Sequence, residues 1–164
     1  MIPAASSGAP APAPLLLNQR LGDGDGRKPS LRLALSADER RRLRGLRRSV
    51  CGRPLLLQLP RGEALQPGEL LADGGLEQVV RVEAAPEPLL RVEAPSGLAL
   101  LQACYHLGNR HVAIEIQAGE LRLLEDPVLA HLLEHRGLTL TPIVAPFLPE
   151  FGAYATGDRH PHDH

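Results

Sequence analysis

Alternation of apolar and polar residues predicts short strands in the first half of the chain. SLRLALS at 30–36 alternates with a period of two residues, and PLLLQLP at 54–60 is a short apolar run between prolines. EQVVRVEA at 77–84 is a third extended segment. A period of two places successive side chains on opposite faces of a sheet. Glycine and proline punctuate the segments between these runs, so residues 30–85 are predicted to form a small β-rich domain.

One segment of this first half has helical character. Ser36 and Glu39 form the Ser-x-x-Glu pattern of a capping box, which predicts a helical turn before Gly45 interrupts it. Six arginines follow between Arg40 and Arg48. Such a run is ordinarily a solvated face. A patch for an acidic partner or for nucleic acid is the alternative, and nucleic-acid binding would show a steep dependence on salt.

From residue 86 onward, the pattern predicts helices that alternate with strands. SGLALLQACYHLG and DPVLAHLLEHRG have apolar residues at helical spacing, with capping residues at their starts and glycine at their ends. HVAIEIQ alternates, and a turn joins it to GELRLLE as in a hairpin. The expected elements are a strand at 87–94, a helix at 96–108, strands at 111–117 and 119–125, a helix at 126–137 and a strand at 138–147. This βαββαβ order predicts an α+β chain in which a ferredoxin-like domain follows the β-rich one.

The two ends of the chain have compositions that do not predict a packed core. Residues 1–29 are rich in alanine, proline and glycine and are expected to form a flexible arm. Residues 155–164 are expected to be a mobile tail that contains histidines, which leaves 86–154 for the C-terminal domain. The first residues lack a basic stretch, and no segment has the roughly 20 apolar residues of a membrane span. These features predict a cytoplasmic protein without a membrane partner.

Charge and motifs argue against several classes of function. Lys and Arg number 18 against 19 Asp and Glu, and the chain has two Phe, two Tyr and no Trp, so a nucleic-acid partner is not expected. P-loop, dinucleotide-binding and nucleophile-elbow motifs are absent from the sequence. HLLEH at 131–135 matches the HxxEH string of inverted zinc peptidases, but such an enzyme also needs a distant carboxylate ligand and a substrate cleft. An exposed helix face is the simpler interpretation, and the chain is predicted not to be an enzyme.

The histidines suggest a different chemistry. All seven follow the junction between the predicted domains; His106 and His111 flank LGNR, and His160, His162 and His164 alternate near the C-terminus. Neutral imidazoles are good ligands for nickel, copper, zinc and cobalt. A flexible segment binds metal weakly alone, because ordering it costs about 1–2 kcal/mol of backbone entropy per residue. A fixed ligand elsewhere must anchor the ion; without one, the tail is only a polar terminus that happens to contain histidines.

Several long strings resemble one family. YHLGNRHVAIEI, QAGELRLLEDPVLAHLLEHRGL and PFLPEFGAY, with LSADERRR, LQLPRGEALQPGELL and VVRVEAAPE in the first half, are similar to UreE, the nickel metallochaperone family of urease maturation. The resemblance covers approximately residues 30–154, and YHLGNRH is its most specific string. It implies a peptide-binding-like N-terminal domain and a ferredoxin-like domain for metal binding and dimerisation.

The resemblance also implies a metal site. In the family, the histidine that ends GNRH binds nickel at the centre of a head-to-head dimer, and this residue is His111. His106 matches a neighbour of the site and is an auxiliary candidate. The tail histidines that would complete the coordination are His160, His162 and His164. Some relatives carry a further histidine pair on the strand after GEL, where this chain has Leu124–Pro127, so those auxiliary sites are not expected.

These implications define the predicted function. The chain is expected to carry Ni(II) as a homodimer, with a metal-linked tetramer as an open alternative. Its expected partners are the accessory GTPase and the apoprotein of the urease maturation complex. Zn(II) and Cu(II) suit the same imidazoles in vitro, so nickel rests on the resemblance alone. A general transition-metal buffer without specific delivery is the alternative function.

Overall fold

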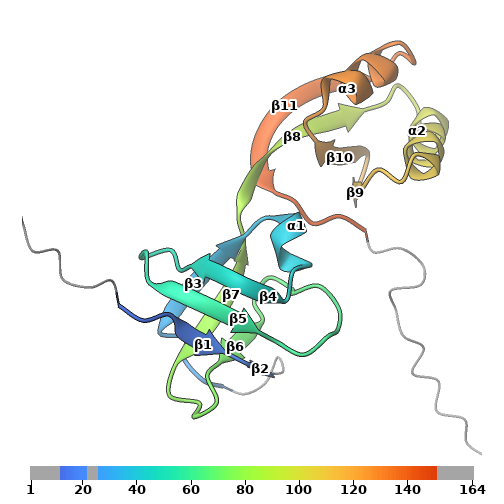
Figure 1. The fold of residues 1–164 in the computed structure, drawn as a ribbon. Coiled ribbons are helices and arrows are strands. Elements are labelled where there is room, and N and C mark those ends of the chain that lie inside the picture. Colours follow the sequence, from blue (N-terminus) through green and yellow to red (C-terminus); the bar gives the residue numbers. More distant parts are fainter. Residues whose placement is uncertain (1–11, 22–25, 151–164) are drawn as a thin grey trace, which may run out of the picture. The chain divides into compact units, whose positions relative to one another are not determined.

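The computed structural model describes residues 12–21 and 26–150, and these form two compact units. One unit combines the residues up to Ala34 with Arg42–Glu83. The other combines Leu35–Arg41 with the residues from Ala84 onward. Figure 1 shows strands dominating the first unit, whereas the second contains both long helices beside its sheet. The predicted α+β class, with β-rich sheets first and a sheet with helices second, is confirmed.

The first unit is built from a three-stranded and a four-stranded sheet. The smaller sheet has the order β1 (Leu15–Leu17), β5 (Pro54–Gln58), β4 (Arg44–Arg48). The larger has the order β2 (Gln19–Leu21), β6 (Leu70–Ala72), β7 (Val79–Ala84), β3 (Leu31–Leu35). Burial alternates along β3 and β5, as the period of two predicts, whereas β6 and β7 each bury two successive residues. Leu17, Leu33, Leu55, Leu57, Leu71 and Val80 are among the buried residues.

Two strands occupy a segment for which the sequence predicted an arm. Residues 15–17 form β1, which pairs in parallel with β5, and residues 19–21 form β2, which pairs antiparallel with β6. The expected arm of 1–29 therefore does not extend through these residues. Strands of three residues are too short to display alternation, and parallel pairing with a distant strand leaves no local signal.

The capping box is present as predicted, but the arginine run that follows is not helical throughout. Ser36 accepts from the Glu39 N–H at 3.2 Å, and the Glu39 carboxylate accepts from the Ser36 N–H at 2.9 Å. Helix α1 spans only Ala37–Arg40, and Arg44–Arg48 is strand β4, antiparallel to β5. Strand β4 was not predicted, because its apolar Leu46 is exposed while Arg47 is half-buried, so apolar and polar residues do not alternate as in a strand with one buried face.

Arg40 departs from the solvated face that the arginine run predicts. Its side chain is buried, and its guanidinium donates a hydrogen bond to the Phe147 carbonyl. Burial lowers the pKa of Arg40 from its ordinary value, while the nearby Glu87 carboxylate acts in the opposite direction. Arg40 therefore joins α1 to the end of the chain's last strand inside the second unit.

The second unit has the predicted βαββαβ order. Its elements are β8 (Pro86–Glu93), α2 (Gly97–Asn109), β9 (Glu115–Gln117), β10 (Glu120–Leu124), α3 (Pro127–Glu134) and β11 (Thr139–Pro146). The antiparallel sheet has the order β11-β8-β10-β9, so the first and third strands are central, as in ferredoxin-like folds. Within the described ranges, no helix combines the length and the apolar character that crossing a membrane requires.

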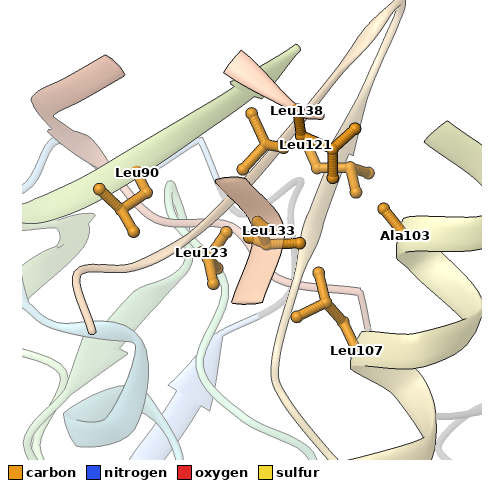
Figure 2. Close-up of a cluster of buried hydrophobic side chains, with 8 residues drawn as sticks. Leu90, Ala103, Leu107, Leu121, Leu123, Leu133 and Leu138 are labelled. Carbon is orange, nitrogen blue, oxygen red and sulfur yellow. The ribbon is translucent and has the colours of Figure 1, made fainter. Parts of the chain in front are cut away.

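The core of this unit lies between the sheet and the two helices. Figure 2 shows Leu107 and Ala103 of α2 directed toward the side chains of Leu133, Leu121 and Leu123. All five are buried, and their aliphatic side chains interdigitate without a polar group. This packing fixes the position of α2, and with it the position of the residues that follow its C-terminus.

Candidate metal site at the end of helix α2

His111 ends helix α2 in a left-handed backbone conformation, with φ of 56°. Its N–H donates to the Gly108 carbonyl at 2.9 Å, and the Val112 N–H donates to the Leu107 carbonyl at 3.1 Å. These two bonds form a Schellman motif, in which the left-handed position is usually glycine. The predicted helix end near Gly108 is therefore displaced, and the histidine itself takes the terminating position.

Helix α3 ends with the same two hydrogen bonds, but there the left-handed position is a glycine, as is usual. Its Gly137 has φ of 76° and donates to the Glu134 carbonyl at 2.9 Å, while Leu138 donates to the Leu133 carbonyl at 3.2 Å. A residue with a Cβ pays roughly 1–2 kcal/mol for the left-handed conformation that glycine adopts freely. The chain thus places glycine at one helix end and a strained histidine at the other. Such strain is concentrated at functional sites.

The position of His111 suits a bound cation. The residue is exposed, so its imidazole can meet an ion from solvent. The carbonyls at a helix C-terminus carry partial negative charge, which favours a cation within the last turn. Hydrogen bonds fix the backbone of the residue, so a metal would not have to order it on binding.

An exposed apolar stripe runs along α2 toward this histidine. Leu98, Leu101 and Tyr105 have exposed fractions of 66%, 69% and 67%. Their spacing of three and four residues places them on one helix face, opposite the buried Ala103 and Leu107. The helix is therefore apolar on two faces, and the residues that the structure describes cover only one of them. A contiguous apolar surface of this kind marks an interaction site.

Glu115 ties the last described residues to the segment that follows His111. Its buried carboxylate accepts the Leu148 N–H at 2.8 Å and contacts the Arg122 guanidinium at 3.4 Å. The Glu150 N–H also donates to the Ile114 carbonyl at 2.8 Å. The chain after β11 consequently returns to the neighbourhood of residues 114–115, a few positions beyond the candidate ligand.

Of the other predicted site residues, the structure describes only His106. His106 is half-buried on α2, and its ring contacts that of Tyr105 edge-on at a centroid distance of 5.5 Å. His160, His162 and His164 lie outside the described residues. Within 12–21 and 26–150, no three His, Cys, Asp or Glu side chains gather in a way that could hold a metal. The described part of each chain therefore offers His111 as a donor on a backbone held by hydrogen bonds, without a group of three ligands around it.

Cys104 does not extend this donor set. Its side chain packs partly against the core of the second unit. Burial raises the pKa of the Cys104 thiol above its ordinary value, which keeps the sulfur protonated near neutral pH. Because the thiolate is the form that binds metal, a metal would have to displace this proton, which makes Cys104 a poorer candidate ligand than the exposed His111.

Known proteins share this arrangement of domains. The N-terminal domain of the UreE urease accessory protein matches residues 17–85, and its C-terminal domain matches residues 87–164. The urease accessory protein UreE of Parasynechococcus marenigrum (strain WH8102) is 56% identical over 148 residues, which cover 90% of this chain and 97% of the relative. The chain belongs to the UreE family of urease accessory proteins.

Other UreE proteins show similar agreement. The protein of Synechococcus sp. (strain WH7805) is 54% identical over 151 residues, or 90% of this chain and 86% of the relative. That of Nostoc sp. (strain PCC 7120 / SAG 25.82 / UTEX 2576) is 47% identical over 133 residues, which cover 81% of this chain and 89% of the relative. The resemblance seen in the sequence is confirmed. Membership of a family of accessory proteins also agrees with the prediction that the chain is not an enzyme.

Two parts of the candidate UreE site were not predicted from the sequence. The apolar stripe of Leu98, Leu101 and Tyr105 has helical spacing, but that spacing is equally typical of core residues. Glu115 lies in an alternating strand and carries no signal that its carboxylate would be buried. The left-handed φ of His111 had only a weak signal in the sequence. After Gly108 the chain continues with Asn109 and Arg110, so no glycine stands where the helix ends.

Proposed function

We propose that the chain forms a homodimer that binds Ni(II) between two His111 side chains and carries it to the urease maturation complex. The observation that carries this proposal is the fixed, exposed imidazole of His111 in a conformation that favours glycine. One imidazole per chain holds a metal weakly, but a two-fold axis brings two copies of the same surface together. A shared site between protomers then needs no second ligand from either described chain.

The apolar stripe on α2 supplies the reason for self-association at this place. It leads to His111 along the same helix, so a two-fold axis near the C-terminal end of α2 would let a second copy contact the stripe and bring the two His111 side chains together. Its three exposed side chains carry no formal charge, which suits an isologous contact because identical surfaces would repel if they were charged. Burying such side chains stabilises a dimer by about 25 cal/mol for each Å² of apolar surface removed from water.

The tail histidines can reach this shared ion. Glu150 is held at Ile114, and His160 follows it by ten residues. A fully extended chain spans at most about 3.5 Å per residue, or roughly 35 Å over that length. The segment between Ile114 and His111 is far shorter. His160, His162 and His164 therefore serve as exchangeable ligands that complete the coordination and release the ion stepwise.

Membership of a family of urease accessory proteins supports delivery to urease. The recipients are the accessory GTPase and the urease apoprotein in a cytoplasmic maturation complex. A general buffer of transition metals would use the same ligands without a recipient. Transfer of bound nickel from the loaded dimer to apo-urease with its accessory proteins separates the two functions. Urease activation without free nickel supports a carrier, whereas release only to a chelator in solution supports a buffer.

Replacing all three tail histidines by alanine should weaken the shared site without removing it. We expect about half a nickel ion per chain at the tight site in both proteins, with the affinity lowered at least about tenfold in the variant, equivalent to roughly 1.4 kcal/mol of binding free energy. Titration with Ni(II), combined with mass determination, measures both quantities. Unchanged affinity would show that the tail does not complete the site.

Introducing charge into the stripe should dissolve the dimer. We expect Leu101→Glu to raise the dissociation constant of the dimer roughly a hundredfold, because two unpaired carboxylates would enter an apolar interface. The tight nickel site should disappear with the dimer although His111 is intact. Val128→Glu on α3 is a matched control, since Val128 is also 69% exposed. A dimeric Leu101→Glu protein that retains tight nickel binding would contradict the proposed interface.

A further inference from the structure

A second pair of imidazoles lies on helix α3, outside the site described above. His131 and His135 are both exposed, and their ring centroids are 4.6 Å apart with an interplanar angle of 80°. Residues four apart on a helix share a face, so neither ring has to cross the helix to approach the other. The pair belongs to the HLLEH string, whose function is not explained by the site at His111.

The backbone holds these two histidines in fixed relation. The His135 N–H donates to the His131 carbonyl at 3.1 Å, which closes a helical turn between them. The next residues continue into the Schellman motif at Gly137, and Leu133 and Leu138 on either side of the motif are buried in the core. The turn that carries the pair is therefore anchored by packing. A metal that bound both rings would restrict their side chains but would not have to order the backbone.

We propose that His131 and His135 form a two-imidazole chelate for a divalent transition-metal ion, with water in the remaining coordination positions. With metal–nitrogen bonds of about 2.1 Å, an imidazole centroid lies roughly 3.2 Å from the metal, so two imidazoles at a right angle have centroids about 4.5 Å apart. The observed edge-on separation of 4.6 Å matches this distance, so the two rings are already as close as two adjacent ligands in a square-planar or octahedral sphere. Ni(II) and Cu(II) adopt these geometries with nitrogen ligands.

The surroundings of the pair favour a cation but not a peptidase. Both rings lie in the last turn of α3, where the helix carbonyls attract positive charge. Glu134 is exposed beside them, and its carboxylate reduces the net charge of the loaded site. No third donor joins the pair among the residues that the structure describes. The site is therefore exchangeable and open to water, and it is suited to hold an ion loosely.

The chelate adds a second class of metal site that does not depend on the proposed function. It lies within one chain, so it predicts one ion per chain, whereas the site shared by two His111 residues predicts half an ion per chain. It also survives dissociation of the dimer. Loss of His111 and of the tail histidines therefore tests the pair separately from the carrier proposal.

A full-length variant that keeps only this pair provides the test. His106 and the three tail histidines are replaced by alanine and His111 by glycine, which leaves His131 and His135 as the remaining histidines. Titration with NiCl₂ should then show one weakly bound ion per chain. Adding His131→Ala or His135→Ala should lower the affinity on the order of tenfold or more, because a chelate loses its second, effectively intramolecular ligand.

A spacing variant keeps the number of histidines constant. His135→Ala combined with Arg136→His, in the same background, moves one imidazole to another side of the helix. We expect it to bind nickel no better than the single-histidine variants. Circular dichroism checks that the exposed substitutions leave the fold intact. Equal affinities in the pair variant, the single variants and the spacing variant would overturn the chelate, as would absence of binding in the pair variant.

Discussion

Replacing His111 by glycine is expected to make the metal-free protein more stable while abolishing the proposed nickel site. The residue occupies the left-handed position of a Schellman motif, with φ of 56°. Glycine adopts this conformation without the steric penalty of a Cβ, so the free energy of unfolding should rise by about 1 kcal/mol. The same change removes the fixed imidazole on which the shared site depends. We expect nickel affinity at that site to fall by at least about a hundredfold, or roughly 2.7 kcal/mol.

His111→Ala is the matched control for this prediction. Alanine also lacks the imidazole, so it should lose nickel to the same extent as glycine. It keeps the Cβ, however, and should show none of the gain in stability. Urea unfolding of the metal-free proteins and nickel titration of the folded ones measure the two effects. If glycine and alanine gave equal stability, the left-handed strain would not exist, and if glycine retained tight binding, His111 would not be the anchoring ligand.

The glycine and alanine variants are expected to differ in stability but not in nickel affinity, because the backbone of His111 costs stability while its side chain is expected to bind the metal. Helix α3 ends in the same hydrogen-bonding motif with Gly137, so the chain shows the unstrained alternative within the same unit. A left-handed residue other than glycine is tolerated where other interactions outweigh its cost, and Leu76, with φ of 58°, is a second example among the described residues. Since the His111 side chain is exposed, its contribution is not packing. Coordination of an ion from solvent is the contribution that an exposed imidazole can make.

The sequence predicted the second unit well because its signals are local. Ser96 accepts from the Ala99 N–H and Asp126 from the Val128 and Leu129 N–H groups, so both helices begin where their capping residues stand. The hairpin between β9 and β10 turns at Ala118-Gly119, where Gly119 has φ of 84°. Such features depend on a few neighbouring residues and are readable without tertiary information.

The sequence was less informative wherever pairing between distant residues decides the structure. Strand β1 exists because Leu15–Leu17 pair with Leu55–Leu57, and no local pattern encodes that partner. The buried Arg40 guanidinium donates a hydrogen bond to the distant Phe147 carbonyl. The five other arginines of the same run had suggested a solvated face. The candidate site shows the same division. His111 is a candidate ligand through the resemblance and stays a prediction, whereas its left-handed backbone and the exposed stripe beside it emerge only from the packed helix.

Replacing Leu107 by alanine is expected to cost the second unit about 3 kcal/mol of unfolding free energy. Leu107 has no exposed surface, and its side chain points from the last turn of α2 toward Leu133 in the core (Figure 2). Truncating a buried leucine removes its transfer free energy and leaves a cavity, at about 2.7–5 kcal/mol. Because the Leu107 carbonyl also accepts the Val112 N–H, the lost packing lies directly beneath the motif that holds His111. Nickel affinity should therefore fall although every ligand is retained.

Urea unfolding, followed by the helical circular-dichroism signal, measures this loss, because α2 and α3 both belong to the second unit. Leu124→Ala is the matched control: it removes the same atoms from the same unit, but Leu124 is 42% exposed. We expect the control to lose about 1 kcal/mol or less and to bind nickel like the parent. If Leu107→Ala lost stability but kept its nickel affinity, the position of His111 would not depend on the packing of α2. The metal site would then be organised by the dimer alone.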